Sequence, residues 1–228
     1  MKCVILCGGK GTRLKELTEE LPKPLIRVGG KPVVSHIMDK YVQEGFNEFI
    51  LCTGYKGEMI KKYFEKNDNK DREIRIIDTG LESTKAKRLS KIEKYLGDDN
   101  FFLAYGDDVA NVNIQELLKF HKENKKIATI TIIHPENPYG VLELRGHEVI
   151  HFKEKPLMNE WINGGYMVLN RRIFEYIGEG DELEKEVFEK LVGERELCAF
   201  KHTGFWKSMN TFKDVQELNN LWKNGNFK

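Results

Sequence analysis

Short apolar runs alternate with segments whose apolar residues recur at helical spacing through the first two-thirds of the chain. The apolar runs predict strands over residues 2–7, 49–53, 74–77, 101–105 and 127–133. The amphipathic segments predict helices over residues 31–44, 56–65, 90–96 and 113–123. This β-α-β-α order is typical of an α/β protein. We therefore expect a mainly parallel, Rossmann-like sheet with helices on both faces.

The last third follows the pattern less regularly. Two short runs, 141–144 and 149–152, predict a small β-hairpin, and residues 211–222 predict a final helix. Residues 66–72 are polar and predict an exposed loop. The sequence has no internal repeat and no low-complexity linker, so we expect residues 1–228 to form a single domain.

Glycines follow the ends of the predicted strands. Gly8 and Gly9 come directly after the first apolar run, Gly54 after the second, and Gly106 after the fourth. In open α/β sheets, ligands bind at the carboxyl ends of the strands. The sequence therefore predicts a ligand site along one edge of the sheet, built from these turns.

Charge and cysteine usage narrow the class of protein. Lys plus Arg total 37 and Asp plus Glu total 36, which lacks the basic excess of a nucleic-acid binder. The four cysteines form no C-x-x-C pair, so we interpret them as small core residues of a cytoplasmic protein. No apolar run is long enough for a signal peptide or a membrane span, and we expect no membrane partner.

The first glycine turn suits a phosphate chain. Residues 8–14 read Gly-Gly-Lys-Gly-Thr-Arg-Leu, in which glycines allow close backbone approach and Arg13 supplies a planar cation. The dinucleotide fingerprint would need glycine where Leu14 stands, and the Walker pattern is absent. Prolines on both sides of Lys23 hold this second cation in an extended segment. From these residues alone, a plain turn and an ordinary loop lysine remain open alternatives.

Several motifs together identify a family. The segments Gly-Gly-x-Gly-Thr-Arg-Leu, Pro-Lys-Pro and Gly-Gly-Lys-Pro, starting at positions 8, 22 and 29, resemble the nucleotidyltransferases that activate sugar 1-phosphates. The motifs Gly-Tyr-Lys-Gly, Tyr-Gly-Asp, Glu-Lys-Pro and Trp-Ile-Asn-Gly-Gly, starting at positions 54, 105, 154 and 161, look most like the glucose-1-phosphate cytidylyltransferase branch. The resemblance implies a Mg²⁺-dependent enzyme that transfers CMP from CTP to a small phosphorylated acceptor and releases pyrophosphate.

The resemblance also implies site residues. Arg13 and Lys23 would neutralise the nucleotide phosphates as the catalytic cations. The nucleotide site would comprise Leu6, Gly8, Gly9, Gly11, Thr12, Gly54, Tyr55, Asp78, Arg88 and Gly106. The acceptor site would comprise Tyr139, Gly140, Glu154, Lys155, Asn163, Gly164 and Gly165, with Lys155 holding the acceptor phosphate. For Asp78, a cap on a strand end is an equally good interpretation.

Metal binding is predicted at Asp107 and Asn210. Asp107 ends a strand, and Mg²⁺ prefers carboxylate and phosphate oxygens. Asn210 stands where the family carries an aspartate, so we expect weaker metal binding with Asp108 or Asp214 as possible compensation.

A second departure concerns the acceptor. The hexose cytidylyltransferases carry Thr-Gly-Gly-Arg-Leu where this chain has Thr-Lys-Ala-Lys-Arg-Leu at 84–89. Lys85, Lys87 and Arg88 would either add positive charge near the ligands or form a solvated basic face. We therefore expect an acceptor other than glucose 1-phosphate, with phosphoglutamine as a resemblance-based candidate and a CDP-activated capsule or surface polysaccharide precursor as the product.

Three alternatives stay open at this stage. Glucose 1-phosphate could still be the acceptor; UTP, dTTP or GTP could replace CTP; and the chain could be a non-catalytic nucleotide sensor that keeps only the base pocket. The assembly we expect is a homodimer, because closed two-fold assemblies are the commonest.

Overall fold

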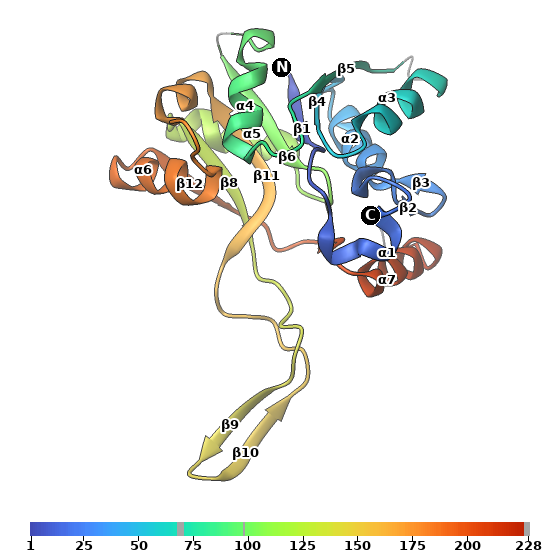
Figure 1. The fold of residues 1–228 in the computed structure, drawn as a ribbon. Coiled ribbons are helices and arrows are strands. Elements are labelled where there is room, and N and C mark those ends of the chain that lie inside the picture. The colour runs from blue at the N-terminus through green and yellow to red at the C-terminus, as the bar shows by residue number, and fades with distance from the viewer. Residues whose placement is uncertain (68–70, 98, 226–228) are drawn as a thin grey trace.

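A seven-stranded sheet forms the centre of the molecule in the computed structural model, which describes residues 1–67, 71–97 and 99–225 (Figure 1). Its strands, in spatial order, are β12 (Leu197–Lys201), β8 (Ala128–Ile133), β11 (Ile162–Asn170), β6 (Asn100–Tyr105), β1 (Cys3–Leu6), β4 (Glu48–Thr53) and β5 (Glu73–Asp78). β11 pairs antiparallel with β6 and β8, whereas the other neighbouring pairs are parallel. The predicted α/β class and mainly parallel sheet are confirmed.

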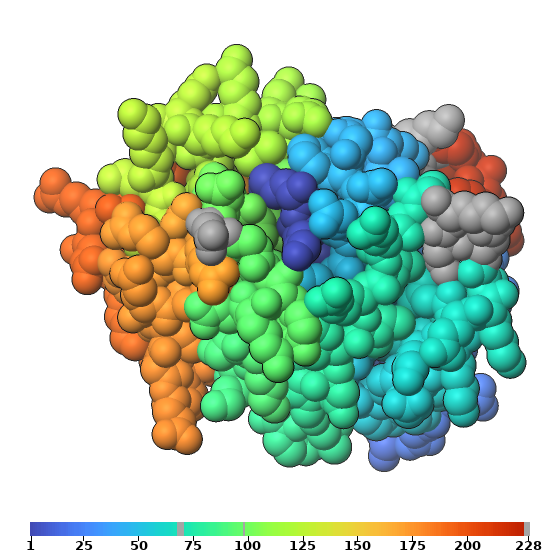
Figure 2. Space-filling view, turned by 90° about the horizontal axis from the view of Figure 1, so that it is seen from above, coloured from blue at the N-terminus to red at the C-terminus, as the bar shows by residue number. Residues whose placement is uncertain are grey.

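Helices cover both faces of this sheet. On one face lie α2 (Val33–Gln43), α3 (Gly57–Lys66) and α5 (Ile114–Asn124); on the other lie α4 (Lys85–Ile92) and α6 (Phe188–Gly193), which follows a π-helical turn at Leu183–Val187. Figure 2, viewed from the end away from the hairpin, shows a small patch of dark-blue amino-terminal residues enclosed by later parts of the chain.

Alternating residues of the central strands pack into two separate hydrophobic cores, one on each face of the sheet. In β1, Ile5 packs into the core beneath α2 and α5, whereas Val4 packs into the core beneath α4 and α6. In β6, Phe102 and Leu103 divide in the same way. Because successive side chains point to opposite faces, a strand covered on both sides must be apolar throughout. This explains the uninterrupted apolar runs of the sequence.

A third, smaller core joins the two ends of the chain. Here α1 (Lys15–Thr18), the pair β2 (Arg27–Val28) and β3 (Lys31–Pro32), and the pair β7 (Asp108–Ala110) and β13 (Trp206–Ser208) meet α7 (Phe212–Lys223). α7 is anchored to the N-terminal region by Asn219, whose side-chain oxygen accepts from the Gly29 N–H at 3.0 Å. This packing holds residues 206–211 beside the first glycine turn.

The predicted hairpin is confirmed. β9 (Val141–Arg145) and β10 (Glu148–Lys153) pair antiparallel and project from the body of the molecule (Figure 1). Every residue of both strands is exposed. Residues 134–140 and 154–161, which we call the stem, connect the hairpin to β8 and β11.

Two differences from the prediction have clear local causes. α4 begins five residues before the predicted start at Ser90, because Thr84 caps it by accepting the Lys87 N–H at 3.1 Å. β11 was not predicted, although it is nine residues long. Its Gly164-Gly165 pair interrupts the apolar pattern, and Gly165 lies at a φ of 80°, which favours glycine. Residues 66–72 include 68–70, which lie outside the described residues.

Candidate active site

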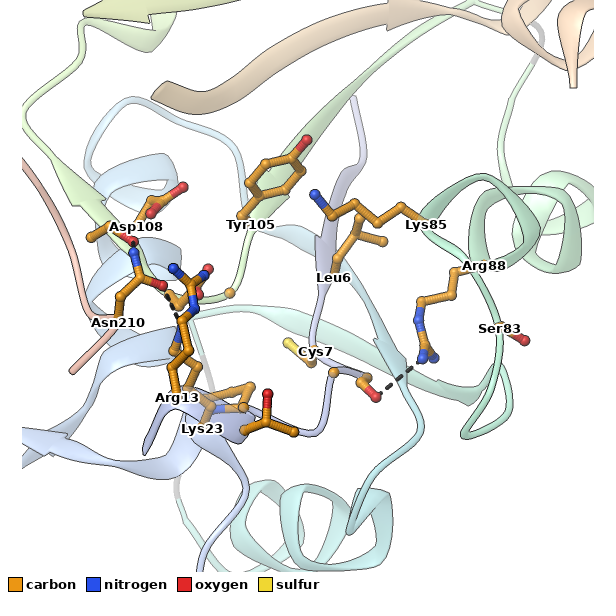
Figure 3. A pocket seen from close by; sticks show the side chains of 18 of the residues that line it. Leu6, Cys7, Arg13, Lys23, Ser83, Lys85, Arg88, Tyr105, Asp108 and Asn210 are labelled. Carbon is orange, nitrogen blue, oxygen red and sulfur yellow. Dashed lines mark hydrogen bonds and ion pairs between the residues drawn. The ribbon is translucent and has the colours of Figure 1, made fainter. Parts of the chain in front are cut away.

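A pocket of about 560 Å³ opens at the carboxyl ends of β1 and β6 (Figure 3). The first glycine turn forms one wall, and α4 with the end of β6 forms another. Its lining residues are Leu6, Cys7, Gly8, Gly9, Gly11, Thr12, Arg13, Lys23, Pro24, Ser83, Thr84, Lys85, Arg88, Tyr105, Gly106, Asp107, Asp108, Glu182, Ser208 and Asn210. The pocket therefore lies where the strand-end glycines of the sequence indicated a ligand site.

The glycine turn is shaped by contacts that side chains would prevent. Gly11 has a φ of 63°, and a Cβ there would lie 2.8 Å from the Thr18 methyl group. Its carbonyl accepts from Leu14 at 2.8 Å, which closes the short 3₁₀ turn at Thr12–Leu14. Arg13 is carried on this turn and points toward Asn210 (Figure 3). A phosphate chain can approach such a turn closely.

Lys23 joins the two predicted metal ligands. Its ammonium group forms an ion pair with Asp107 and donates to the Asn210 side-chain oxygen at 3.2 Å. The Asn210 amide nitrogen donates to the Ser208 hydroxyl at 2.8 Å, which turns the amide oxygen toward Lys23. Two hard oxygen atoms thus face one cation at the mouth of the pocket, a donor set that suits Mg²⁺ completed by phosphate oxygens. Asp107 and Asn210 are therefore chemically suited to hold it.

The other two carboxylates suggested as metal ligands have different surroundings. Asp108 lines the pocket but is buried, and burial together with the neighbouring Asp107 raises its pKa to about 8. Asp214 lies at the start of α7, where its carboxylate accepts the backbone N–H groups of Asn210 and Thr211 at 2.9 and 2.7 Å. Asp214 therefore caps the helix and fixes the Asn210 backbone. Its suggested role at the metal site stays a prediction.

Arg88 is buried behind the glycine turn rather than on a solvated face. Its guanidinium donates to five oxygen atoms within 3.2 Å: the carbonyls of Thr53, Gly80, Leu81 and Gly8, and the Thr79 hydroxyl. These acceptors lie at or just after the ends of three neighbouring strands, β1, β4 and β5. Burial lowers the pKa of Arg88, but a guanidinium remains charged at any physiological pH. Arg88 thus ties three strand-end turns together around one cation, and Figure 3 draws its hydrogen bond to the Gly8 carbonyl.

A polar network holds two residues of the pocket lining, Lys85 and Tyr105. Tyr105 donates to Glu184, and Lys85 forms an ion pair with the same carboxylate while its ammonium lies 4.1 Å from the Tyr105 ring centroid. The Asn163 amide donates to the Tyr105 hydroxyl at 3.2 Å. Burial and the Glu184 charge raise the pKa of Tyr105, so its hydroxyl stays protonated. The pocket lining therefore places the Lys85 ammonium beside the Tyr105 ring, with the Glu184 carboxylate holding both.

Comparison with known proteins identifies the family. A sequence model described as nucleotidyl transferase matches residues 2–225. The chain belongs to this nucleotidyltransferase family.

Curated relatives are similar along nearly the whole chain. It is 38% identical to a probable glucose-1-phosphate cytidylyltransferase of Bacillus subtilis, over 99% of this chain and 97% of that one. It is 39% identical to the glucose-1-phosphate cytidylyltransferase of Salmonella typhimurium, with the same coverage. The sequence-based assignment to this family is confirmed.

Solved structures share the fold. HddC from Yersinia pseudotuberculosis superposes with a TM-score of 0.78, covering 97% of this chain and 99% of that one at 21% identity. Among the described residues of this nucleotidyltransferase, no helix has the length and apolar character needed to cross a membrane.

The nucleotidyltransferase pocket brings together eleven of the residues that the sequence indicated. They are Leu6, Gly8, Gly9, Gly11, Thr12, Arg13, Lys23, Arg88, Gly106, Asp107 and Asn210. Gly54 and Tyr55 lie directly behind it, since the Tyr55 N–H donates to the Gly8 carbonyl at 3.1 Å. A Cβ on Gly54 would approach this carbonyl at 2.9 Å, so only glycine fits. Asp78 accepts the Gly80 N–H at 2.8 Å and so caps the turn after β5.

The predicted acceptor residues divide into two groups. Asn163, Gly164 and Gly165 lie beside the pocket: Asn163 bonds Tyr105, and Gly165 packs closely on Asp108. The Gly164 carbonyl accepts from the Trp206 indole at 2.8 Å. The others are on the stem of the projecting hairpin and do not line the pocket: Tyr139, Gly140, Glu154 and Lys155.

Sequence reasoning missed several lining residues of the nucleotidyltransferase pocket. Glu182 and Ser208 gave no local signal, because each reaches the pocket from an element distant in sequence. Tyr105 is next to the predicted Gly106, but its aromatic ring fitted a core position in an apolar strand equally well. Lys85 was considered only as one of three basic residues on α4.

Proposed function

We propose that the protein transfers CMP from CTP to a small phosphorylated acceptor. In this reaction an acceptor phosphate oxygen forms a bond to the α-phosphorus of CTP. The bond from that phosphorus to the bridging oxygen breaks, and pyrophosphate leaves with the electron pair. A phosphate monoester has a second pKa near ~6 and is mostly a dianion at pH 7, so the attack requires no general base. The main obstacle is repulsion between anions.

The observation that carries the proposal is the position of Lys23. Its ammonium lies between Asp107 and Asn210 beside the glycine turn, and Arg13 points to the same place. Two cations there would bind and orient the triphosphate and stabilise the charge that develops on the leaving pyrophosphate. Mg²⁺ held by Asp107 and Asn210 would supply further positive charge on the phosphate oxygens.

The base would lie near the turns that Arg88 holds. The carbonyl groups of Gly8, Gly80 and Leu81 all accept from this guanidinium, which fixes their directions. Backbone carbonyls are hydrogen-bond acceptors, and the amino group of cytosine is a donor. An acceptor that faces the 4-position of the base would select the amino group of cytosine over the carbonyl of uracil, and two full-length relatives are named cytidylyltransferases.

We propose phosphoglutamine as the acceptor, giving a CDP-activated precursor for capsule or surface polysaccharide. Lys85 and Glu182 both line the pocket, and charges of both signs suit an acceptor that has a carboxylate and an ammonium group. A hexose ring has neither group. The second candidate is glucose 1-phosphate, which the names of the relatives favour.

A pyrophosphate-release assay tests these proposals. CTP, UTP, dTTP and GTP are each combined with phosphoglutamine, glucose 1-phosphate and a panel of other phosphorylated sugars, polyols and amino acids. Release with CTP and phosphoglutamine supports the full proposal, whereas release with CTP and glucose 1-phosphate supports the second candidate. A sensor would neither release pyrophosphate nor exchange labelled pyrophosphate into any nucleotide, and that result would refute catalysis.

A further inference from the structure

Three basic residues lie close together at the start of α4, and each has different surroundings. Lys87 is exposed and does not line the pocket. Arg88 lines the pocket, but its guanidinium is buried and donates to five protein oxygen atoms. Lys85 also lines the pocket, and its side chain is 41% exposed even though it forms an ion pair with Glu184. Of these three cations, the Lys85 ammonium is therefore the one that a molecule in the pocket can reach.

Glu184 holds Lys85 and Tyr105 together from outside the pocket lining. The Tyr105 hydroxyl donates to the same carboxylate oxygen that pairs with the Lys85 ammonium. Glu184 lies in the π-helical turn that precedes α6, and such turns are rare and frequently mark functional sites. The Thr84 hydroxyl donates to the Asp181 carbonyl at 2.7 Å, which fastens the start of α4 to the segment leading into this turn. The position of the Lys85 ammonium is thus fixed from two sides.

Lys85 lies apart from the cations assigned to the nucleotide phosphates. In Figure 3 its ammonium points toward Tyr105, whereas Arg13 and Lys23 lie together lower in the view. The side-chain amide of Asn163, a predicted acceptor residue, donates to the Tyr105 hydroxyl at 3.2 Å. Lys85 is therefore connected, through the carboxylate and the hydroxyl just described, to the part of the pocket where the acceptor is expected.

The ion pair between Lys85 and Glu184 is suited to exchange with a ligand. Partly exposed ion pairs are weak, so the ammonium can turn from Glu184 to a ligand at little cost. A ligand that covers the ammonium removes water from it, and neutral hydroxyl groups compensate only in part. An anionic group on the ligand compensates fully, because a charge-assisted hydrogen bond is about twice as strong as a neutral one. Lys85 should therefore favour an acceptor with a second anionic group over a neutral hexose.

We infer that Lys85 is a specificity-determining residue, which selects acceptors that carry an anionic group in addition to their phosphate. This inference rests on the proposed function, in which phosphoglutamine is the acceptor. Glu184 is a positioning residue, since it holds the Lys85 ammonium and the Tyr105 hydroxyl but does not line the pocket. Glu182 does line the pocket and would repel a carboxylate placed beside it, so the acceptor carboxylate has to face Lys85.

A matched pair of acceptors measures this selection. Phosphoglutamine is compared with its α-carboxamide derivative, which has nearly the same size and the same phosphate but no carboxylate charge, at saturating CTP. The wild type should have a kcat/KM about 10–10² higher for the acid, mainly through KM, because the amide loses a hydrogen bond between two charged groups. In Lys85→Met this ratio should fall to within about threefold of unity, since the charged partner is gone. Lys85→Arg keeps the charge and should retain most of the preference.

Two further variants separate a contact with the acceptor from a structural role. Glu184→Gln breaks the same ion pair but leaves the ammonium in the pocket, so its preference for the acid should stay at about tenfold or more. Lys87→Met removes the same charge from an exposed position of α4 and should leave the ratio unchanged. If Glu184→Gln loses the preference as completely as Lys85→Met does, Lys85 only holds the wall of the pocket together, and the inference is overturned. An unchanged ratio in Lys85→Met also overturns it.

The wild type distinguishes failure of this inference from failure of the proposed function. Equal use of the acid and the amide, or use of glucose 1-phosphate at least as efficient as that of phosphoglutamine, would overturn the role of Lys85 while leaving CMP transfer intact. Absence of pyrophosphate release with every substrate pair would instead refute the proposed function, and the inference with it.

Discussion

Replacing Arg88 by Met should loosen the turns around the pocket and also lower the free energy of unfolding. Two of its five acceptors keep another donor: the Gly8 carbonyl also accepts from Tyr55, and the Thr53 carbonyl also accepts from Thr79. The Gly80 and Leu81 carbonyls lose the donor that Arg88 provides. An unsatisfied buried acceptor costs about 1–3 kcal/mol, and these two lie close enough to solvent to favour the lower half of that range. We therefore expect a loss of about 3 kcal/mol.

That loss is measurable by thermal unfolding. For a chain of this size, each kcal/mol lowers the Tm by about 2–4 °C, so Arg88→Met should unfold roughly 6–12 °C below the wild type. The KM for CTP should rise more than kcat falls, because the Gly8, Gly54 and Gly80 turns lose their common anchor while the catalytic cations remain. Arg88→Lys should be intermediate, since an ammonium retains the charge but lacks the planar array of five donors.

Lys87→Met is the matched control. It removes the same charge from the adjacent position of α4, where the side chain is exposed, and should change the Tm by less than about 2 °C. If Arg88→Met has the same Tm as Lys87→Met and binds CTP with the wild-type affinity, the anchoring role assigned to Arg88 is wrong.

Three further predictions concern single side chains. Lys23→Ala should lower turnover by about 10²–10³ without changing the Tm strongly, and wild-type rates in a steady-state assay would remove Lys23 from the catalytic set. Asn210→Asp should tighten Mg²⁺ binding in a titration, because a charged oxygen replaces a neutral one beside Asp107; weaker binding would contradict the proposed metal site. His121 is buried against Thr129, and burial lowers its pKa to about 4. Between about pH 6.5 and 4 the unfolded chain therefore binds one more proton at His121 than the folded chain does. The free energy of unfolding should fall by roughly 2–3 kcal/mol as the pH falls through that range. His121→Gln should flatten this part of the urea-midpoint profile, and an unchanged profile would show that His121 does not titrate as the fold requires.

The sequence predicted the elements whose local pattern of apolar residues matches their burial in the fold. The β1 and β6 strands are apolar throughout because both faces are covered, so their runs were visible without a structure. β11 was invisible because its glycines sit against Asp108 and Ile133, a reason that only the folded neighbours reveal. Thr84 offered a cap that the apolar spacing alone did not reveal.

The candidate site was predictable to a similar extent. Residues in one continuous motif, such as Gly8 and Arg13, were found because the motif itself carries the chemistry. Arg88 was found as a basic residue, but its burial depends on carbonyl groups from three separate strands. The position of Lys155 depends on where the stem points, and no local pattern encodes the direction of a projecting hairpin.

The packing of α7 against the start of the chain fixes the order in which the site can be completed. The ribosome synthesises the glycine turn before Ser208 and Asn210. These two residues take their final positions only after α7, which ends at Lys223 and bonds the Asn210 backbone through Asp214, has been made. Lys23 and Asp107 must therefore emerge from the ribosome before Asn210, which later accepts a hydrogen bond from Lys23. Until α7 docks on β2, a nascent chain should bind nucleotide poorly, and CTP added during synthesis should protect only chains in which α7 has already emerged.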